Sequence, residues 1–254
     1  MTPRSRTARL SGFALAGALA LGLAACSSDA TVEPANESDA GDQQEQLDPA
    51  AVVQTSLDTL DETSYSLALT AGDFSSGEMT HDPSAQAYHA FTSVDASAAG
   101  SMGTVEAEVI GIGQDVWIKP TGGVTNSVPE LQDVWIHTTA QGTPSLVGMD
   151  LKQLTDQLFD SLSNIEQVDE YTYTADVDTH NVSQLPSSAP ITVTVVLDDR
   201  GRLVELTGEM PDPTDASQTV PATITVTGYG EPVDVSAPPA DQVLELDDLD
   251  FDGF

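Results

Sequence analysis

Residues 191–206 read ITVTVVLDDRGRLVEL, and this stretch decides the class of fold. Apolar side chains occupy every second position from Ile191 to Leu197, which is the period of a strand with one buried face. Asp-Asp-Arg-Gly at 198–201 has the composition of a turn, and apolar residues resume at Leu203. Two strand-like runs joined by so short a connection predict an antiparallel hairpin.

The same alternation of apolar and polar residues recurs along much of the chain. It is present in four further stretches, at residues 63–70, 104–109, 171–177 and 222–226. A short echo, QDVWI, appears at 114–118 and again at 132–136, and it predicts two neighbouring strands with Trp117 and Trp135 on equivalent faces. Because these runs follow one another without a regular alternation with helices, they favour an antiparallel sheet over a parallel one.

Two segments have the spacing of an amphipathic helix instead. Asp48 and Pro49 form an N-cap and a first helical residue, and apolar residues at helical spacing follow, from Val53 to Leu60. Asp150 begins the second helix, whose apolar stripe runs through Leu151, Leu154, Leu158 and Leu162. The residues therefore predict an α+β fold, an antiparallel sheet with two helices packed on it. The sheet curls either around a filled core or around a space that the helices only partly fill.

The charge balance of the chain excludes several classes of function. Seven Lys and Arg stand against 41 Asp and Glu, for a formal charge of −34. Such a polyanion repels phosphate backbones and anionic lipid headgroups, so we expect no binding to nucleic acid and no basic membrane-docking patch. The single cysteine excludes an internal disulfide, a cysteine zinc cluster and a dithiol redox centre.

The first 26 residues have the organisation of an export signal. Three arginines precede an apolar run at 13–25, which as a helix reaches roughly 20 Å, short of the ~30 Å hydrocarbon core of a bilayer. Leu-Ala-Ala-Cys at 23–26 resembles the lipobox of bacterial lipoproteins, in which the cysteine becomes the first mature residue and carries lipid. We therefore predict a signal peptide at 1–25, acylation of Cys26 with palmitate-type chains, and an anchor on the extracytoplasmic face of the cell membrane. An ordinary signal peptide with a chance cysteine is the alternative.

Acidic segments flank the predicted folded domain. Residues 27–49 contain seven acidic residues, no basic residue and no aromatic one, a composition that buries too little apolar surface to fold. We predict that residues 26–49 form the lipidated cysteine and a disordered tether, that 50–243 form the folded domain, and that 244–254 form a loose acidic tail.

Few residue patterns in the chain point to catalysis or to a metal. The four histidines lie outside an HExxH motif, and no serine lies in GxSxG. Asp176, Asp178 and His180 would share one face of a strand, but ligands spaced along a strand seldom converge on one ion. Residues 248–253 match the opening of a calcium loop and lack its last ligand. We predict no enzyme activity, no cofactor and no metal site.

The order of the motifs carries a resemblance to a known family. GIGQDVWIKP at 111–120 is followed by DVWIHTT at 133–139 and YTYTADVDTH at 171–180. The hairpin at 191–210 then precedes ATITVTGYGEPVDVSAPPADQV at 222–243, which is the most specific part. In this order the chain resembles the actinobacterial LppX/LprA/LprF/LprG lipoprotein family. The Val-Asp-Gly step common in that family is replaced here by Gln-Val-Asp-Glu at 167–170.

The resemblance implies a LolA-like, strongly curved half-barrel sheet with a few helices covering its concave face. It also implies an apolar cavity that takes acyl chains, for transport or display of acylated lipids or glycolipids in the cell envelope, with a membrane exporter as a candidate partner. Burial of each lipid methylene would contribute about 0.8 kcal/mol. The candidate cavity residues are the apolar ones of both helices and of two strands: Val53, Leu57, Leu60, Leu154, Leu158, Leu162, Val193, Val195 and Ile224.

Two other readings of the same residues remain open. Each candidate cavity residue is also an ordinary core residue, so the fold could belong to a non-catalytic structural or interaction lipoprotein with a filled core. A hydrolase is the least favoured class, because no catalytic motif supports it.

Overall fold

A computed structural model describes residues 47–95, 103–139, 151–182, 190–212 and 218–246 of the chain. The chain divides into two units, Met1–Gln44 and Glu45–Phe254, and all described residues belong to the second. Among those residues, no helix has both the length and the apolar character needed to cross a bilayer.

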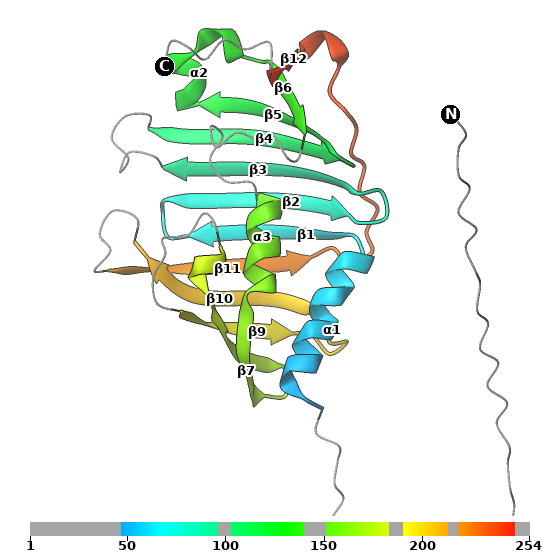
Figure 1. The fold of residues 1–254 in the computed structure, drawn as a ribbon, viewed down its shortest axis with the longest axis vertical. Helices are drawn as coiled ribbons and strands as arrows, with labels where there is room; N and C mark the ends of the chain where they lie inside the picture. Colours follow the sequence, from blue (N-terminus) through cyan, green and yellow to red (C-terminus); the bar gives the residue numbers. More distant parts are fainter. Residues whose placement is uncertain (1–46, 96–102, 140–150, 183–189, 213–217, 247–254) are drawn as a thin grey trace, which may run out of the picture. The chain divides into compact units, whose positions relative to one another are not determined.

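The described part of the chain forms one 12-stranded sheet with two longer helices on one of its faces (Figure 1). The α-helices are α1 (Pro49–Glu62), α2 (Gly123–Ser127) and α3 (Leu151–Asp160). The strands are β1 (Tyr65–Ala71), β2 (Ser75–Asp82), β3 (Ala87–Asp95), β4 (Thr104–Ile112), β5 (Asp115–Gly122), β6 (Trp135–Thr139), β7 (Leu162–Asp169), β8 (Thr172–Val177), β9 (Ile191–Leu197), β10 (Leu203–Pro211), β11 (Thr219–Thr227) and β12 (Val243–Glu245). Short 3-10 turns lie at Pro129–Leu131, Thr179–Asn181 and Ala240–Gln242.

The strand order explains how the sheet is built. It runs β12-β6-β5-β4-β3-β2-β1-β11-β10-β9-β8-β7, and every pairing is antiparallel except β12 with β6. Strand β11 joins the two halves because it pairs with both β1 and β10. In Figure 1 the segment after β11 runs past the ends of β1–β5 and brings β12 to the far edge of the sheet. The predicted fold class, a curved antiparallel half-barrel with few helices, is confirmed.

Helix α1 begins where the residues predict. The Asp48 carboxylate accepts a hydrogen bond from the Ala50 N–H at 3.1 Å, and Pro49 occupies the first helical position. Val53 and Leu60 are buried against the sheet, and the helix lies over β7 and β10. The helix ends as the chain turns into β1.

The core lies between the helices and the inner face of the sheet. The registers place apolar side chains of five consecutive strands in one buried row, made of Leu67, Met79, Ala90, Val109 and Ile118. Each of these residues alternates with a neighbour on the outer face, as the period of two requires. The repeated QDVWI segments do form neighbouring strands. Trp117 pairs with His137, two residues from Trp135, so both tryptophans lie on the same face of the sheet, as predicted.

Three local predictions are wrong. Leu162 does not continue the stripe of the second helix, because α3 ends at Asp160 and Leu162 is the first residue of β7. The backbone closes at Ser161, whose N–H donates to the carbonyls of Gln157 at 3.1 Å and Leu158 at 3.2 Å. The helix ends at this turn, and Leu162 continues the chain as a strand residue.

The second wrong prediction concerns Asp176, Asp178 and His180. They do not share a strand face, because β8 ends at Val177 and the Asp178 carboxylate caps the turn at Thr179–Asn181 by accepting from the His180 N–H at 3.0 Å. The Asp176 carboxylate instead accepts hydrogen bonds from the side chains of Asn164 and Thr192.

The third concerns the acidic tail, predicted to be loose from residue 244. Leu244 and Glu245 belong to β12, which pairs in parallel with β6. Glu245 is held at the sheet edge because its carboxylate lies 2.8 Å from His137 Nδ1. Residues 247–254, with the partial calcium motif, lie outside the described residues.

Candidate functional site

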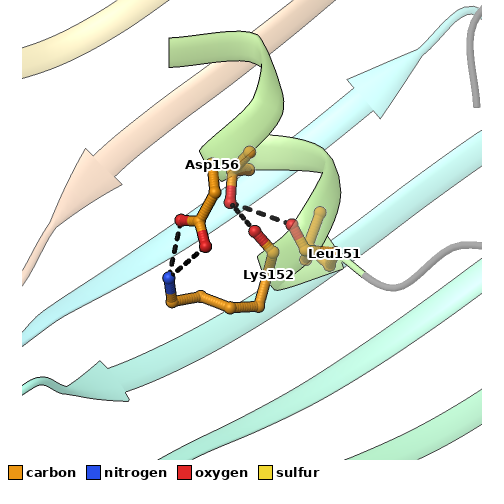
Figure 2. Close-up of polar contacts among 4 residues, drawn as sticks. Leu151, Lys152 and Asp156 are labelled. Carbon is orange, nitrogen blue, oxygen red and sulfur yellow. Dashed lines mark hydrogen bonds and ion pairs between the residues drawn. The ribbon is translucent and has the colours of Figure 1, made fainter. Parts of the chain in front are cut away.

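The candidate site lies between helix α3 and the sheet. The buried helix residues Leu151, Leu154 and Leu158 face the sheet at the spacing of one helical face. Figure 2 shows the polar side of α3, where Lys152 Nζ lies 2.6 Å from each carboxylate oxygen of Asp156. The Thr155 hydroxyl donates to the carbonyls of Leu151 and Lys152, so this buried polar group is satisfied within the helix. The helix is therefore amphipathic, with its leucines against the sheet.

An apolar pocket of about 60 Å³ lies between α3 and the inner face of β1, β9, β10 and β11. It is lined by apolar side chains and by Thr223, and no charged residue contributes to it. The lining residues are Leu69, Ala71, Phe74, Leu154, Leu158, Ile191, Val193, Leu206, Gly208, Met210, Ala222, Thr223 and Ile224.

A row of small residues opens this space. Ala71 pairs with Ala222, Ala222 with Gly208, and Gly208 with Val193, so three strands in succession place almost no side chain beneath α3. A Cβ at Gly208 would lie 2.9 Å from Val193 Cγ1, so the absence of a side chain there also permits the close approach of β9. Sequence reasoning missed this row, because its members are far apart in the chain and only the register brings them together.

The nine predicted cavity residues fall into two groups. Leu154, Leu158, Val193 and Ile224 line the pocket. The others belong to the surrounding core, where Val53, Leu60 and Val195 are fully packed and Leu57 and Leu162 are partly buried against it. Contact of any of these residues with a lipid stays a prediction.

The size of the pocket sets a limit on what it holds in this conformation. Sites for small organic ligands typically enclose about 300–1,000 Å³. The pocket under α3, at about 60 Å³, is several times smaller. In this conformation the pocket is therefore too small to enclose a whole acyl chain.

Two buried titratable residues, His81 and Tyr65, lie outside the lining of the apolar pocket. His81 on β2 is 8 % exposed and contacts Tyr65 edge to face, with ring centroids 5.3 Å apart. Burial, with a smaller contribution from the Lys152 charge, lowers the pKa of His81 to about 4, so the imidazole is neutral at pH 7. Its Nδ1 has no hydrogen-bond partner among the described residues. Burial likewise raises the pKa of the Tyr65 hydroxyl.

The described residues contain no group of three or more histidine, cysteine, aspartate or glutamate side chains placed to hold a metal ion. The predicted lipidation site, Cys26, lies outside the part of the chain that the structure describes.

Comparison with known proteins finds similarity to solved structures. No protein-family model and no curated protein matches the chain. The crystal structure of LprF from Mycobacterium bovis is similar, with 15% identity over 75% of this chain and 96% of that chain, at a TM-score of 0.42.

Proposed function

We propose that this chain is a membrane-anchored extracytoplasmic lipoprotein that takes the acyl chains of a lipid between α3 and the inner face of the sheet. The observation that carries the proposal is the pocket beneath α3, which small residues of three neighbouring strands open and which no charged residue lines. Transfer of each methylene from water into such surroundings contributes about 0.8 kcal/mol, so acyl chains bind there without hydrogen-bond partners.

Binding requires α3 to move, and its connections define how. The helix passes into β7 through Ser161 alone, so its C-terminal end is held at the sheet. Its N-terminal end rests on Leu151, which lies over β2. We infer that α3 pivots about Ser161 and lifts its leucines from Ala71, Ala222 and Gly208, which enlarges the pocket along the row of small residues.

The anchor is the second part of the proposal. Acylation of Cys26 by a diacylglyceryl group and an N-linked chain would exceed the two-signal threshold for stable membrane attachment. Metabolic labelling with a radioactive fatty acid tests it. Label should be incorporated into the native chain and into Ser27→Ala, and lost in Cys26→Ala. Equal labelling of all three chains would overturn the anchor.

Native mass spectrometry tests the lipid site. Residues 27–254, expressed in a heterologous host, should carry copurified lipid, or take up added palmitate or diacyl phospholipid after delipidation. Ala222→Leu, which fills the pocket from β11, should abolish uptake. Ala68→Leu adds the same volume on the outer face of β1 and should leave uptake unchanged.

The alternative function is a structural or interaction lipoprotein with a filled core, and the small size of the pocket favours it. A protein that is isolated lipid-free and ignores every added glycerolipid would support this alternative. Equal loss of uptake in Ala222→Leu and Ala68→Leu would show that the lipid does not bind beneath α3.

A further inference from the structure

The outer face of β1–β5, opposite to the helices, has a shallow hollow of about 390 Å³. An aromatic ring lies in this hollow among carboxylates. Its outer-face lining includes Ala68, Glu78, Phe91, Glu106, Glu108 and Thr121. Phe91 is 49 % exposed, although it lies in the middle of a strand in the interior of the sheet. The Phe91 ring therefore presents a half-exposed π face on an otherwise polar surface.

The register places Phe91 directly between two glutamates. It pairs with Glu78 on β2 and with Glu108 on β4, so the three side chains stand in one row on the same face. Directly opposed residues of antiparallel strands have Cβ atoms about 5 Å apart, so both glutamates are immediate neighbours of Phe91.

One of the two carboxylates is held in position. His89 Nε2 lies 2.8 Å from Glu108 Oε1, and the His89 ring contacts Phe91 edge to face with centroids 4.8 Å apart. The imidazole therefore fixes both the carboxylate and the ring. A ligand that uses Phe91 and Glu108 together meets a preorganised pair, which lowers the entropy cost of binding.

No lysine or arginine of the described residues forms an ion pair with the row. Lys119 is opposite Glu108 in the register, but its Nζ lies 3.7 Å from Asp133 and over the Trp135 ring. Glu78 and Glu106 have no hydrogen-bond or ion-pair partner in the described ranges. The hollow thus combines an exposed aromatic face with Glu78 and Glu106, which are available to an external cation, and with Glu108, of which His89 contacts one oxygen.

We propose that the row Glu78–Phe91–Glu108 is a docking site for an arginine side chain presented by a basic segment of another protein. A guanidinium placed over the Phe91 ring gains a cation–π contact, and its planar edge donates to the flanking carboxylates in a geometry that an ammonium does not reproduce. A second copy of this chain is a poor occupant, because its own formal charge is −34 and it would bring further carboxylates to the hollow.

The docking site is independent of the lipid proposal, because it lies on the opposite face of the sheet. Its test uses residues 27–254 labelled with ¹⁵N and a short peptide, acetyl-Gly-Arg-Gly-Arg-Gly-amide, at about 0.15 M salt, where exposed charges more than about 8 Å apart are largely screened. Amide shifts should cluster on Glu78, Phe91 and Glu108. The citrulline peptide should not bind, and the lysine peptide should bind more weakly.

Variants separate this site from general attraction to an acidic protein. Phe91→Leu keeps an apolar residue and removes the ring, and it should weaken binding about threefold. Glu78→Gln with Glu108→Gln should weaken binding about fivefold. Glu130→Gln with Glu166→Gln removes the same charge from exposed positions outside the hollow, and it should change the affinity less than about twofold.

Three results would overturn the docking site. One is an equal loss of affinity in the two double glutamine variants, which would assign binding to net charge. Another is an unchanged affinity in Phe91→Leu. The third is a dimer in sedimentation that Phe91→Leu dissociates, which would make a second copy the occupant.

Discussion

Gly77 on β2 lies directly beneath Leu151 of α3. A Cβ at Gly77 would be 3.0 Å from Leu151 Cδ2 and 3.3 Å from the carbonyl oxygen of Phe91. The first residue of α3 therefore sits in a place that β2 leaves free of a side chain. This contact holds the N-terminal end of the helix, the end that the proposed pivot must release.

Gly77→Ala should destabilise the protein by about 1 kcal/mol, because the new methyl group overpacks against Leu151. Leu151→Ala should itself cost about 2–5 kcal/mol, and Gly77→Ala should cost less in that background because the clash is gone. Urea unfolding of the four chains measures the coupling. Strictly additive effects would mean that Leu151 does not rest on Gly77.

His81 should make the protein less stable in mild acid. The unfolded chain takes up a proton near the ordinary histidine pKa of 6.5, whereas burial lowers the folded pKa to about 4. The unfolded state therefore binds more protons between these values, and stability falls as the pH drops from 6.5 to 4 by about 3 kcal/mol.

Comparison of unfolding free energies at pH 7 and pH 4.5 in His81→Leu measures this effect, since the loss on acidification should be smaller in the variant. His180→Gln, at an exposed histidine, is the control and should behave like the native chain. The same acid loss in His81→Leu as in the native chain would show that His81 is not buried in its neutral form.

His137 should have the opposite dependence on pH. Its Nδ1 lies 2.8 Å from Glu245 on β12, and its Nε2 lies 3.0 Å from Asp115 on β5. The hydrogen bonds that the His137 ring donates, first to Glu245 and then to Asp115, raise the pKa of His137. A raised folded pKa means that the contribution is complete below pH 6.5 and is lost as the pH rises through the folded value.

His137→Gln should therefore lose about 1 kcal/mol at pH 6 and almost nothing at pH 9. NMR titration of the His137 ring proton should give a pKa above 6.5, and Glu245→Gln should lower it. Faster amide hydrogen exchange at β12 should accompany either variant at pH 6. A ring pKa at or below 6.5 in the native chain would show that protonated His137 does not hold β6 and β12 together.

Arg202 should stabilise the β9–β10 turn through geometry as well as charge. Its guanidinium donates from Nε to Asp198 Oδ2 at 2.8 Å and lies 4.8 Å from the centroid of the Tyr229 ring. Arg202→Lys keeps the charge but loses the planar fork and the stacked contact, and it should cost about 1 kcal/mol. Arg200→Lys, at an exposed position of the same turn, should cost little in thermal unfolding. Equal effects of the two changes would contradict this role.

Local sequence patterns predicted the elements well where the signal was periodic. The alternation at 191–197 and the turn at 198–201 correspond to β9 and the start of β10, and Asp48 and Pro49 mark the beginning of α1. The prediction failed at Leu162, where an apolar residue in helical register is the first residue of a strand. Backbone hydrogen bonds at Ser161 decide this boundary, and hydrophobic spacing carries no information about them.

By itself, the order of residues determined the antiparallel sheet and the two amphipathic helices, because each depends on neighbours a few positions apart. The acidic character of the chain follows from its composition alone. Only the tertiary structure decided that Ala71, Ala222 and Gly208 leave a space beneath α3, and that Phe91 stands between Glu78 and Glu108. These juxtapositions depend on the register of strands that are distant in the chain. That register follows from the packing of all strands at once, so no local pattern contains it.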